Sequence, residues 1–275
     1  MWKNVRAIEG VIYAKATSNN VYHSIYSCWS SSFCTPPLGF SVACWLLCLI
    51  AIYELATMYK FNLTETIALL VINTAIVVAI NQINYDFSQV MRIVSVTIWC
   101  FVVPMILIFT PKRFSKITIA IFAIALFVPA YYSLVVIHAI FGSWQLISLM
   151  AIAWVADSGA YFVGKAFGKR KLAPKISPGK SIEGAAGGIL LVILYLLTLK
   201  FFNVAVYLAN YRAAIKFALI LTVVSVIGDL FESWLKRVAQ VKDSGNILPG
   251  HGGVFDRVDS LIAVLSIGFA LIWVA

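Results

Sequence analysis

The residues best suited to chemistry in this sequence are carboxylates in its C-terminal part. Seven of the 11 acidic residues lie at or after Asp157. Asp229 and Glu232 are three residues apart, as are Asp256 and Asp259, so a helix places each pair on one face. Clustered carboxylates are the hard oxygen ligands that Mg²⁺ takes, usually together with substrate phosphates. The spacing therefore predicts a cation site for a phosphorylated ligand.

Basic residues, hydroxyls and glycines lie close to these acids in the sequence. The run from Pro249 to Gly253 reads PGHGG, and its glycines allow backbone N–H groups to approach an anion closely. A second stretch, Ser177 to Ser181, places a lysine and a hydroxyl beside a glycine and predicts contacts to phosphate. The candidate ligand-binding residues are Ser233, Lys236, Arg237, His251, Gly252, Gly253, Lys165, Lys180 and Ser181.

The composition places these residues in a membrane protein. Of 275 residues, 62% are hydrophobic and only 12% are charged, whereas a soluble domain is about 25% charged. Strands with open edges cannot satisfy their backbone in lipid, so we expect an all-α polytopic helical bundle. The length allows about eight to nine transmembrane helices with two active-site loops and no large extramembrane domain.

Eight long apolar runs predict the spans. They extend over Leu38 to Met58, Thr66 to Ile80, Ile93 to Phe109, Ile117 to Ile140, Trp144 to Val163, Ala185 to Leu199, Ala213 to Leu235 and Leu261 to Ala275.

The basic residues predict the orientation. Ten of the 21 lie in two long loops, Gly164 to Gly184 and Lys236 to Asp259, which we expect on the cytoplasmic side. Residues 36–275 are expected to form one membrane-embedded domain, preceded by an atypical polar segment, residues 1–35. Eight spans place that segment outside, yet it carries Lys3, Arg6 and Lys15. Either it contains a further weak span or the positive-inside rule fails here.

Acids near the centre of a span are costly, at about 2.5–3.5 kcal/mol each on the insertion scale. Such residues line a wet or ion-filled cavity, and in that case they mark a functional site. The alternative is that they cap helix ends or form interfacial ion pairs, which is most reasonable for Asp243 or Glu183 alone.

The run from Ser233 to Asp259 resembles a known signature. It reads SWLKRVAQVKDSGNILPGHGGVFDRVD, which matches S-x-x-K-R-x₄-K-D, then P-G-H-G-G, then D-R-x-D of the phosphatidate cytidylyltransferases (CDP-diacylglycerol synthases). The segment Asp157 to Gly188, DSGAYFVGKAFGKRKLAPKISPGKSIEGAAGG, resembles the block that precedes this signature in the family. The resemblance extends from about Pro36 to the C-terminus, and residues 1–35 depart from it.

The resemblance implies a reaction in which CTP and phosphatidate give CDP-diacylglycerol and pyrophosphate with Mg²⁺. It implies metal ligation by Asp229 and Asp256, with Asp157 and Asp259 as further ligands or neighbours, and phosphate contacts by Lys236, Arg237, Lys242 and Arg257. The catalytic set is therefore Asp229, Asp256, Lys242, Arg257, Asp259 and Asp157. The family also implies a homodimer in a bacterial cytoplasmic (inner) membrane, in contact with membrane lipids and with no nucleic-acid partner. A need for a second, monovalent cation is left open.

Two other functions compete with this interpretation. A related enzyme would use CTP on another membrane lipid, of isoprenoid type. A secondary transporter would also bury acids, but its site tends to lie near the midplane, often between repeated halves. Here the acids cluster toward one side and no internal repeat is evident.

Overall fold

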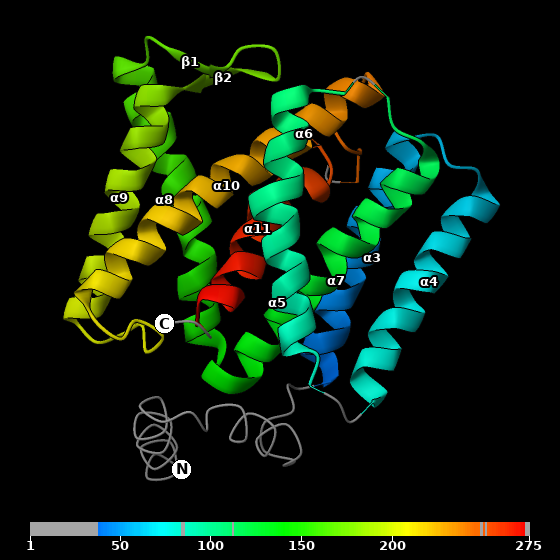
Figure 1. Cartoon of the computed structure of the whole chain (residues 1–275), viewed down its shortest axis with the longest axis horizontal. Coiled ribbons are helices and arrows are strands. Elements are labelled where there is room, and N and C mark those ends of the chain that lie inside the picture. Colours follow the sequence, from blue (N-terminus) through cyan, green and yellow to red (C-terminus); the bar gives the residue numbers. More distant parts are fainter. Residues whose placement is uncertain (1–37, 84–85, 112, 248–249, 251, 273–275) are drawn as a thin grey trace.

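The computed structural model describes residues 38–83, 86–111, 113–247, 250 and 252–272. Eight continuous helices make up most of this part of the chain (Figure 1). They are α3 (Leu38–Met58), α4 (Leu63–Gln82), α5 (Ser88–Val96) continued by the π-helix η1 (Thr97–Val102) and α6 (Val103–Phe109), α7 (Lys116–Phe141), α8 (Ser143–Phe167), α9 (Ile182–Phe201), α10 (Tyr211–Ala239) and α11 (Phe255–Ile272).

The expectation of an all-α membrane bundle is confirmed. Among the described residues, seven of the helices are long and apolar enough to cross a bilayer. The eighth, α11, does not meet that criterion because charged residues occupy its first turns, at Asp256, Arg257 and Asp259. Whether residues 1–35 contain a further span lies outside the described part of the chain.

Local sequence signals explain where several helices begin. Asn62 and Glu65 form a capping box at the start of α4, in which each side chain accepts the other residue's backbone N–H. The side chains of Ser115, Ser181 and Asn210 accept a backbone N–H in the first turn of α7, α9 and α10. Each cap pairs a donor that the first helical turn leaves free.

The boundaries of the two long loops differ from the expectation. Helix α8 continues to Phe167 and α10 continues to Ala239, while α11 already begins at Phe255. Lys165 and Lys236 are therefore helical, as are the acids of the D-R-x-D motif. The apolar runs marked only the membrane-buried part of each helix, whereas backbone hydrogen bonding continues into the charged ends.

A small antiparallel hairpin, which was not expected, occupies the first long loop. Strands β1 (Lys171–Ala173) and β2 (Ser177–Ser181) pair Lys171 with Ser181 and Ala173 with Ser177. Arg237 of α10 donates through Nε to the carbonyl oxygen of Ile176 at 3.4 Å. This bond and the buried Ile176 side chain fasten the hairpin to the bundle.

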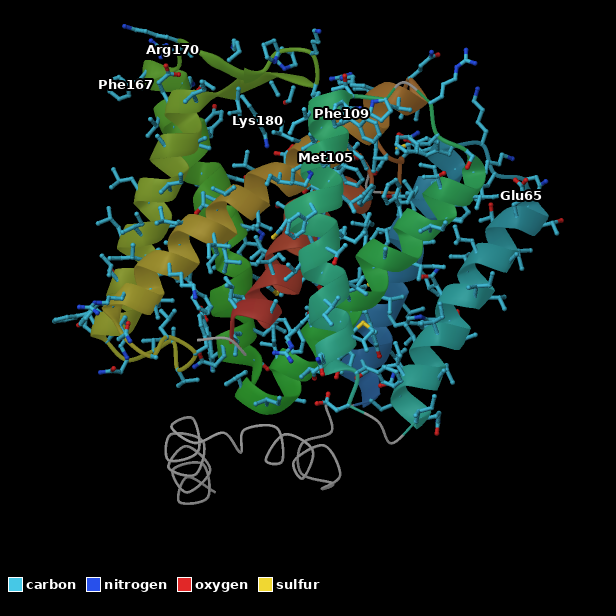
Figure 2. All side chains as sticks on the ribbon, viewed as in Figure 1. Glu65, Met105, Phe109, Phe167, Arg170 and Lys180 are labelled. Atoms are coloured by element: carbon cyan, nitrogen blue, oxygen red, sulfur yellow. The ribbon has the colours of Figure 1, made fainter. Side chains whose placement is uncertain are left out.

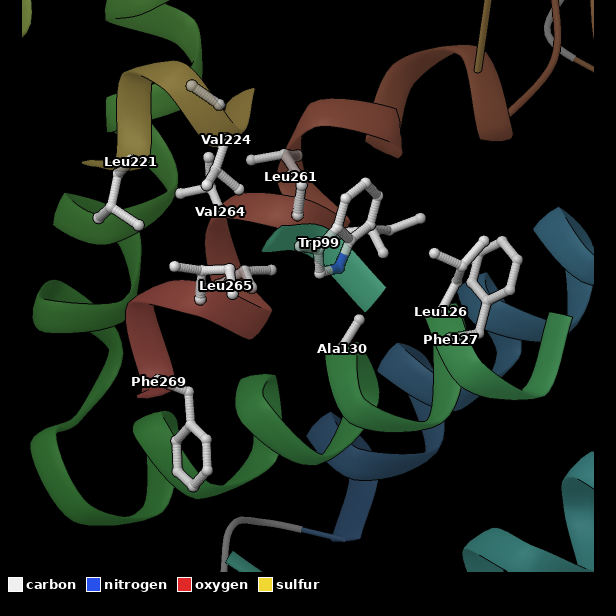
Figure 3. Close-up of a cluster of buried hydrophobic side chains, with 14 of the residues drawn as sticks. Trp99, Leu126, Phe127, Ala130, Leu221, Val224, Leu261, Val264, Leu265 and Phe269 are labelled. Atoms are coloured by element: carbon white, nitrogen blue, oxygen red, sulfur yellow. The ribbon is translucent and has the colours of Figure 1, made fainter. Parts of the chain in front are cut away.

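Helix α7 lies at the centre of the bundle. It packs against α3, α4, α5, α8 and α11, while α10 crosses α8, α9 and α11 obliquely (Figure 1). Side chains from α7, α10, α11 and η1 interdigitate in the core, among them Leu126, Val224, Leu261 and Trp99 (Figure 3). Separating these helices would lose close packing between their side chains, which lipid chains do not reproduce.

The chain alternates between two ends of the bundle. The hairpin, residues 240–247 and 252–254 and the starts of α4 and α7 lie at one end, here called the hairpin end (Figure 1). The turn at Gly142 and residues 202–210 lie at the opposite end. Both long basic segments are thus on the same side, as the alternation of spans predicts.

Candidate active site

Glycines bring α8 and α9 close together beside Asp157. A Cβ placed on Gly188 would lie 2.8 Å from the carbonyl oxygen of Ala156, and one on Gly159 would lie 2.9 Å from the carbonyl oxygen of Gly187. Only a residue without a side chain permits this approach. The contact fixes Asp157, the residue after Ala156, relative to α9.

A second close crossing, between α10 and α11, positions two further acids. A Cβ on Gly228 would lie 2.9 Å from the carbonyl oxygen of Asp259. Asp229 follows Gly228 directly on α10. The same crossing therefore brings Asp229 and Asp259 together from two helices.

Asp157, Asp229 and Asp259 form one group, here called the acid cluster. Asp157 and Asp259 are each within electrostatic range of Asp229 and of Lys180. The Lys180 ammonium lies 2.6 Å from Asp229 Oδ2, and Ser233 Oγ donates to Asp229 Oδ1 at 3.4 Å. Figure 2 shows Lys180 reaching from the hairpin toward α10.

The acid cluster is open to its surroundings. Asp157 is exposed, and Asp229 and Asp259 are partly exposed. When all three are ionised, Lys180 balances one of three negative charges and leaves two. An excess of this size inside an apolar bundle is what a divalent cation neutralises.

Asp256 belongs to a different set of contacts. Its Oδ1 lies 2.8 Å from the Lys236 ammonium, and its Oδ2 accepts the backbone N–H groups of Ser244 at 3.0 Å and Gly253 at 2.8 Å. Lys236 also lies 2.8 Å from Glu232 Oε1, an electrostatic contact without the angle of a hydrogen bond. Both Asp256 oxygens are thus already engaged.

Glu54 of α3 is a buried acid that the sequence analysis missed. Its side chain accepts the backbone N–H groups of Val254 at 2.9 Å and Phe255 at 2.8 Å, and the Ser244 hydroxyl at 3.1 Å. The signal was present, because Glu54 is the one charge in the apolar run Leu38–Met58. Such a carboxylate is expected to have a specific partner.

The donor chemistry fits a magnesium ion, although the site is not preformed. Among the residues that the structure describes, no three His, Cys, Asp or Glu side chains converge as a ready metal site. Asp157, Asp229 and Asp259 supply hard oxygens with an excess of negative charge, which suits Mg²⁺ with water and phosphate oxygens completing its shell. The residues present therefore fit the ion.

The remaining predicted residues are distributed around this centre. Ser181 accepts the Gly184 N–H as a helix cap, and the Lys165 ammonium lies 5.7 Å from the centre of the Tyr161 ring. Lys242 and Arg257 are exposed at the hairpin end. Gly252 has φ of +80° beside Asp256, while His251 lies outside the described residues. Their roles toward a ligand stay predictions.

The described part of the chain encloses an apolar cavity of about 380 Å³. Its walls come from α6, α9, α10 and the hairpin, and include Leu107, Ile176, Ile189, Ile227 and Leu230. Two of these elements also form the contact between Lys180 of the hairpin and Asp229 of α10. The same pair of elements therefore contributes to an apolar space and to a charged contact.

Comparison with known proteins agrees with this combination. A family model described as "Cytidylyltransferase family" matches residues 21–275. A phosphatidate cytidylyltransferase of Staphylococcus aureus is 36% identical over 230 residues, covering 80% of this chain and 84% of that relative. Phosphatidate cytidylyltransferases of Bacillus subtilis and Pseudomonas aeruginosa are 50% identical over 125 residues and 45% identical over 152 residues. In these two matches the chain spans about half the length of the relative, 46% and 54%.

Proposed function

Because the chain belongs to the cytidylyltransferase family, we propose that it transfers the cytidylyl group of CTP to phosphatidate, as a nucleotidyltransferase of phospholipid biosynthesis. The products are CDP-diacylglycerol and pyrophosphate. The observation that carries the proposal is the acid cluster with Lys180, formed by elements of which α10 and the basic hairpin also line an apolar cavity. A lipid phosphate and a nucleoside triphosphate need such a junction.

The proposed reaction needs alignment and charge neutralisation more than a protein nucleophile. A phosphate oxygen of phosphatidate forms a bond to the α-phosphorus of CTP, and the bond from that phosphorus to the bridging oxygen breaks. The electron pair leaves with pyrophosphate. A phosphate monoester is largely ionised near pH 7, since its second pKa is about 6, so no strong base is required. Holding the two phosphates in line supplies much of the rate enhancement.

Magnesium, when bound, would supply positive charge that offsets the negative charge of the phosphates and of the leaving pyrophosphate. We propose that Asp229 and Asp256 hold it, with Asp157 and Asp259 as further ligands or neighbours. Asp256 keeps Oδ2 on backbone N–H groups, so Oδ1, which now contacts Lys236, is the atom left to face a cation. If a cation takes the place of Lys236 at Asp256 Oδ1, the Lys236 ammonium becomes available to bind a phosphate.

The basic residues would bind the phosphates. Lys180 and Lys236 lie closest to the carboxylates, at 2.6 and 2.8 Å, and are placed to neutralise substrate charge beside the metal. Lys242 and Arg257, exposed at the hairpin end, are proposed to contact the triphosphate of CTP. Gly252 and Gly253, with His251, would shape the nucleotide pocket.

The cavity under the hairpin supports a lipid as the acceptor. Its lining is almost entirely apolar, and its volume of about 380 Å³ accommodates hydrocarbon rather than a hydrated headgroup. The basic loops favour an orientation with the hairpin end in the cytoplasm, where CTP is made. The bacterial relatives support a bacterial inner membrane as the location. A homodimer stays part of the proposal as an expectation from the family.

Purified protein in mixed micelles with CTP labelled on the α-phosphate tests the proposal. We expect labelled CDP-lipid and pyrophosphate that both depend on phosphatidate and on Mg²⁺. Labelling of an isoprenoid phosphate in preference to phosphatidate would contradict the assigned acceptor. CTP that stays intact with every lipid acceptor would overturn the enzymatic function and favour the alternative, a secondary transporter.

A further inference from the structure

Glu54 sits far from the catalytic motifs in the sequence and yet contacts the segment between them. It lies one turn before the end of α3 and is only 2% exposed. Its hydrogen-bond donors are the Ser244 hydroxyl and the backbone N–H groups of Val254 and Phe255. All of them belong to residues 240–247 and 252–255, the described residues from the end of α10 to the first residue of α11.

A buried carboxylate is tolerated only where donors replace its water. Two donors of Glu54 are backbone N–H groups at the N-terminus of α11, where the helix dipole favours a negative charge. Each of these N–H groups uses a different carboxylate oxygen, Oε1 for Val254 and Oε2 for Phe255. The geometry requires a group with two acceptors.

The segment itself is shaped to fit around Glu54. A Cβ on Gly245 would lie 2.6 Å from Glu54 Oε1, and one on Gly253 would lie 2.5 Å from Oε2. Ser244 contacts both carboxylates of this region, because its hydroxyl donates to Glu54 and its N–H donates to Asp256. Glu54 and Asp256 together, here called the loop clamp, hold the segment at both of its ends.

We propose that Glu54 is a positioning residue that orders residues 240–247 and 252–255 for binding the triphosphate of CTP. It rests on the proposed function, because Lys242, Gly252 and Gly253 of this segment are the proposed nucleotide contacts. Glu54 itself acts through Ser244 and the start of α11. Its loss disorders the pocket while leaving the carboxylates of the acid cluster and the lipid side in place.

The test uses Glu54→Gln in the full-length protein. Glutamine keeps the size but has one acceptor oxygen, so its NH₂ group faces either the Val254 or the Phe255 N–H and leaves that donor unpaired. We expect the KM for CTP to rise about tenfold or more, which corresponds to the loss of one such bond. The KM for phosphatidate should change less than about twofold, and kcat less than about threefold.

Ser244→Ala keeps the inference falsifiable if Glu54→Gln does not fold, and the double variant adds a test where both single variants fold. Ser244→Ala removes one hydrogen bond and spares both backbone bonds, so the KM for CTP should rise about threefold to fivefold. In the double variant the rise in the KM for CTP, expressed as a free energy, should be smaller than the sum of the two single effects, because both substitutions act through one contact. Glu65→Gln, an acid of the same type at the start of α4 (Figure 2), is the matched control and should leave both KM values unchanged.

Amide hydrogen exchange supplies a readout that does not depend on activity. Exchange at residues 240–247 and 252–255 should accelerate in Glu54→Gln, whereas α8 and α9 should exchange as in the wild type. Equal acceleration throughout the bundle, or an unchanged KM for CTP in both variants, would overturn the inference. A wild-type protein without cytidylyl transfer would contradict the proposed function instead, and the exchange result would still decide whether Glu54 holds the segment.

Discussion

The acid cluster and the loop clamp are both built from carboxylates, but the partners of those carboxylates differ, and so do their roles. Glu54 and Asp256 of the clamp each accept at least two backbone N–H groups at 2.8 to 3.0 Å. In the described part of the chain, Asp157 and Asp229 of the cluster accept no backbone N–H group, and Asp259 accepts one, from Ser260 at 2.7 Å. Lys180 lies near all three acids. Carboxylates that are fully paired hold a segment in place, whereas carboxylates left with excess charge can bind a cation.

The difference follows from what surrounds each group. The clamp faces the N-terminus of α11 and the irregular segment before it, where backbone donors are free. The cluster faces the sides of α8, α10 and α11, whose backbone groups are already paired within their helices. Acids on helix sides therefore depend on side chains, ions or ligands for their partners.

Removing charge from the acid cluster should have the largest effect. In Asp229→Asn we expect kcat to fall about 10³-fold, because several kcal/mol of metal-dependent stabilisation of the transition state is lost. The fold should persist, since asparagine is nearly isosteric. Turnover of labelled CTP by the purified variant measures the loss, with its melting temperature as the control. Activity within tenfold of the wild type would remove Asp229 from the metal site.

Asp256→Asn tests whether the clamp and the cluster are separate. Asparagine has one acceptor oxygen in place of two, so either the backbone donors or the cation loses a partner. We expect activity to fall about 10²-fold and unfolding to become easier by about 1–3 kcal/mol, the penalty of an unpaired buried donor. Turnover and thermal unfolding are measured on the same sample. Normal turnover would exclude Asp256 as a metal ligand.

Lys180→Gln should move metal and substrate binding in opposite directions. Without the ammonium 2.6 Å from Asp229, the cluster becomes more negative and its half-saturating Mg²⁺ concentration should fall. The KM for CTP or phosphatidate should rise about tenfold, because a charge-assisted contact to phosphate is lost. Magnesium titrations at fixed substrate check the first effect. Weaker binding of both metal and substrates would contradict the arrangement.

Gly188→Ala probes the helix contact beside Asp157. The added Cβ would lie 2.8 Å from the Ala156 carbonyl oxygen, so α8 and α9 must move apart. We expect destabilisation by about 1–3 kcal/mol, despite the better helix propensity of alanine. Gly179→Ala, which has no neighbour within 4 Å of the new atom, is the control. Equal melting temperatures for the two variants would show that the contact is unimportant.

Glu65→Gln should have the smallest effect of all. Glu65 pairs with Lys116 and caps α4, but both side chains are well exposed, at 37% and 45%. Solvent screens such pairs strongly. We expect unchanged turnover and a melting temperature within experimental error of the wild type. A clear loss of activity would show that acids outside the two groups also contribute to the site.

The helices and one face of the site were predictable from the sequence. Apolar runs located the spans, because lipid requires about 20 such residues for each crossing. The helical period places Asp229 and Ser233, four residues apart, on one face of α10, and their side chains are within hydrogen-bond distance. These features depend on neighbours in the sequence and on one helical period.

Other features depend on contacts that the sequence does not display. Two of the three donors of Glu54 are backbone groups about 200 residues away, and any residue type except proline supplies a backbone N–H. The partners of Asp256 likewise include the backbone N–H groups of Ser244 and Gly253, which reach it because the residues before α11 fold back on that helix. The two strands of the hairpin contain only three and five residues, too few for a clear alternation of apolar and polar residues.

The hydrogen bonds between α3 and the start of α11 also join parts of the chain that are synthesised at different times. Val254 lies 200 residues after Glu54, and ribosomes add roughly 5–20 residues per second, so the donors are synthesised about 10–40 s after their acceptor. During that interval the nascent α3 carries an acid without its eventual partners. A chain released before residue 254 lacks the means to bury it. Glu54 of α3 therefore obtains its backbone hydrogen-bond donors only after the start of α11 has been synthesised.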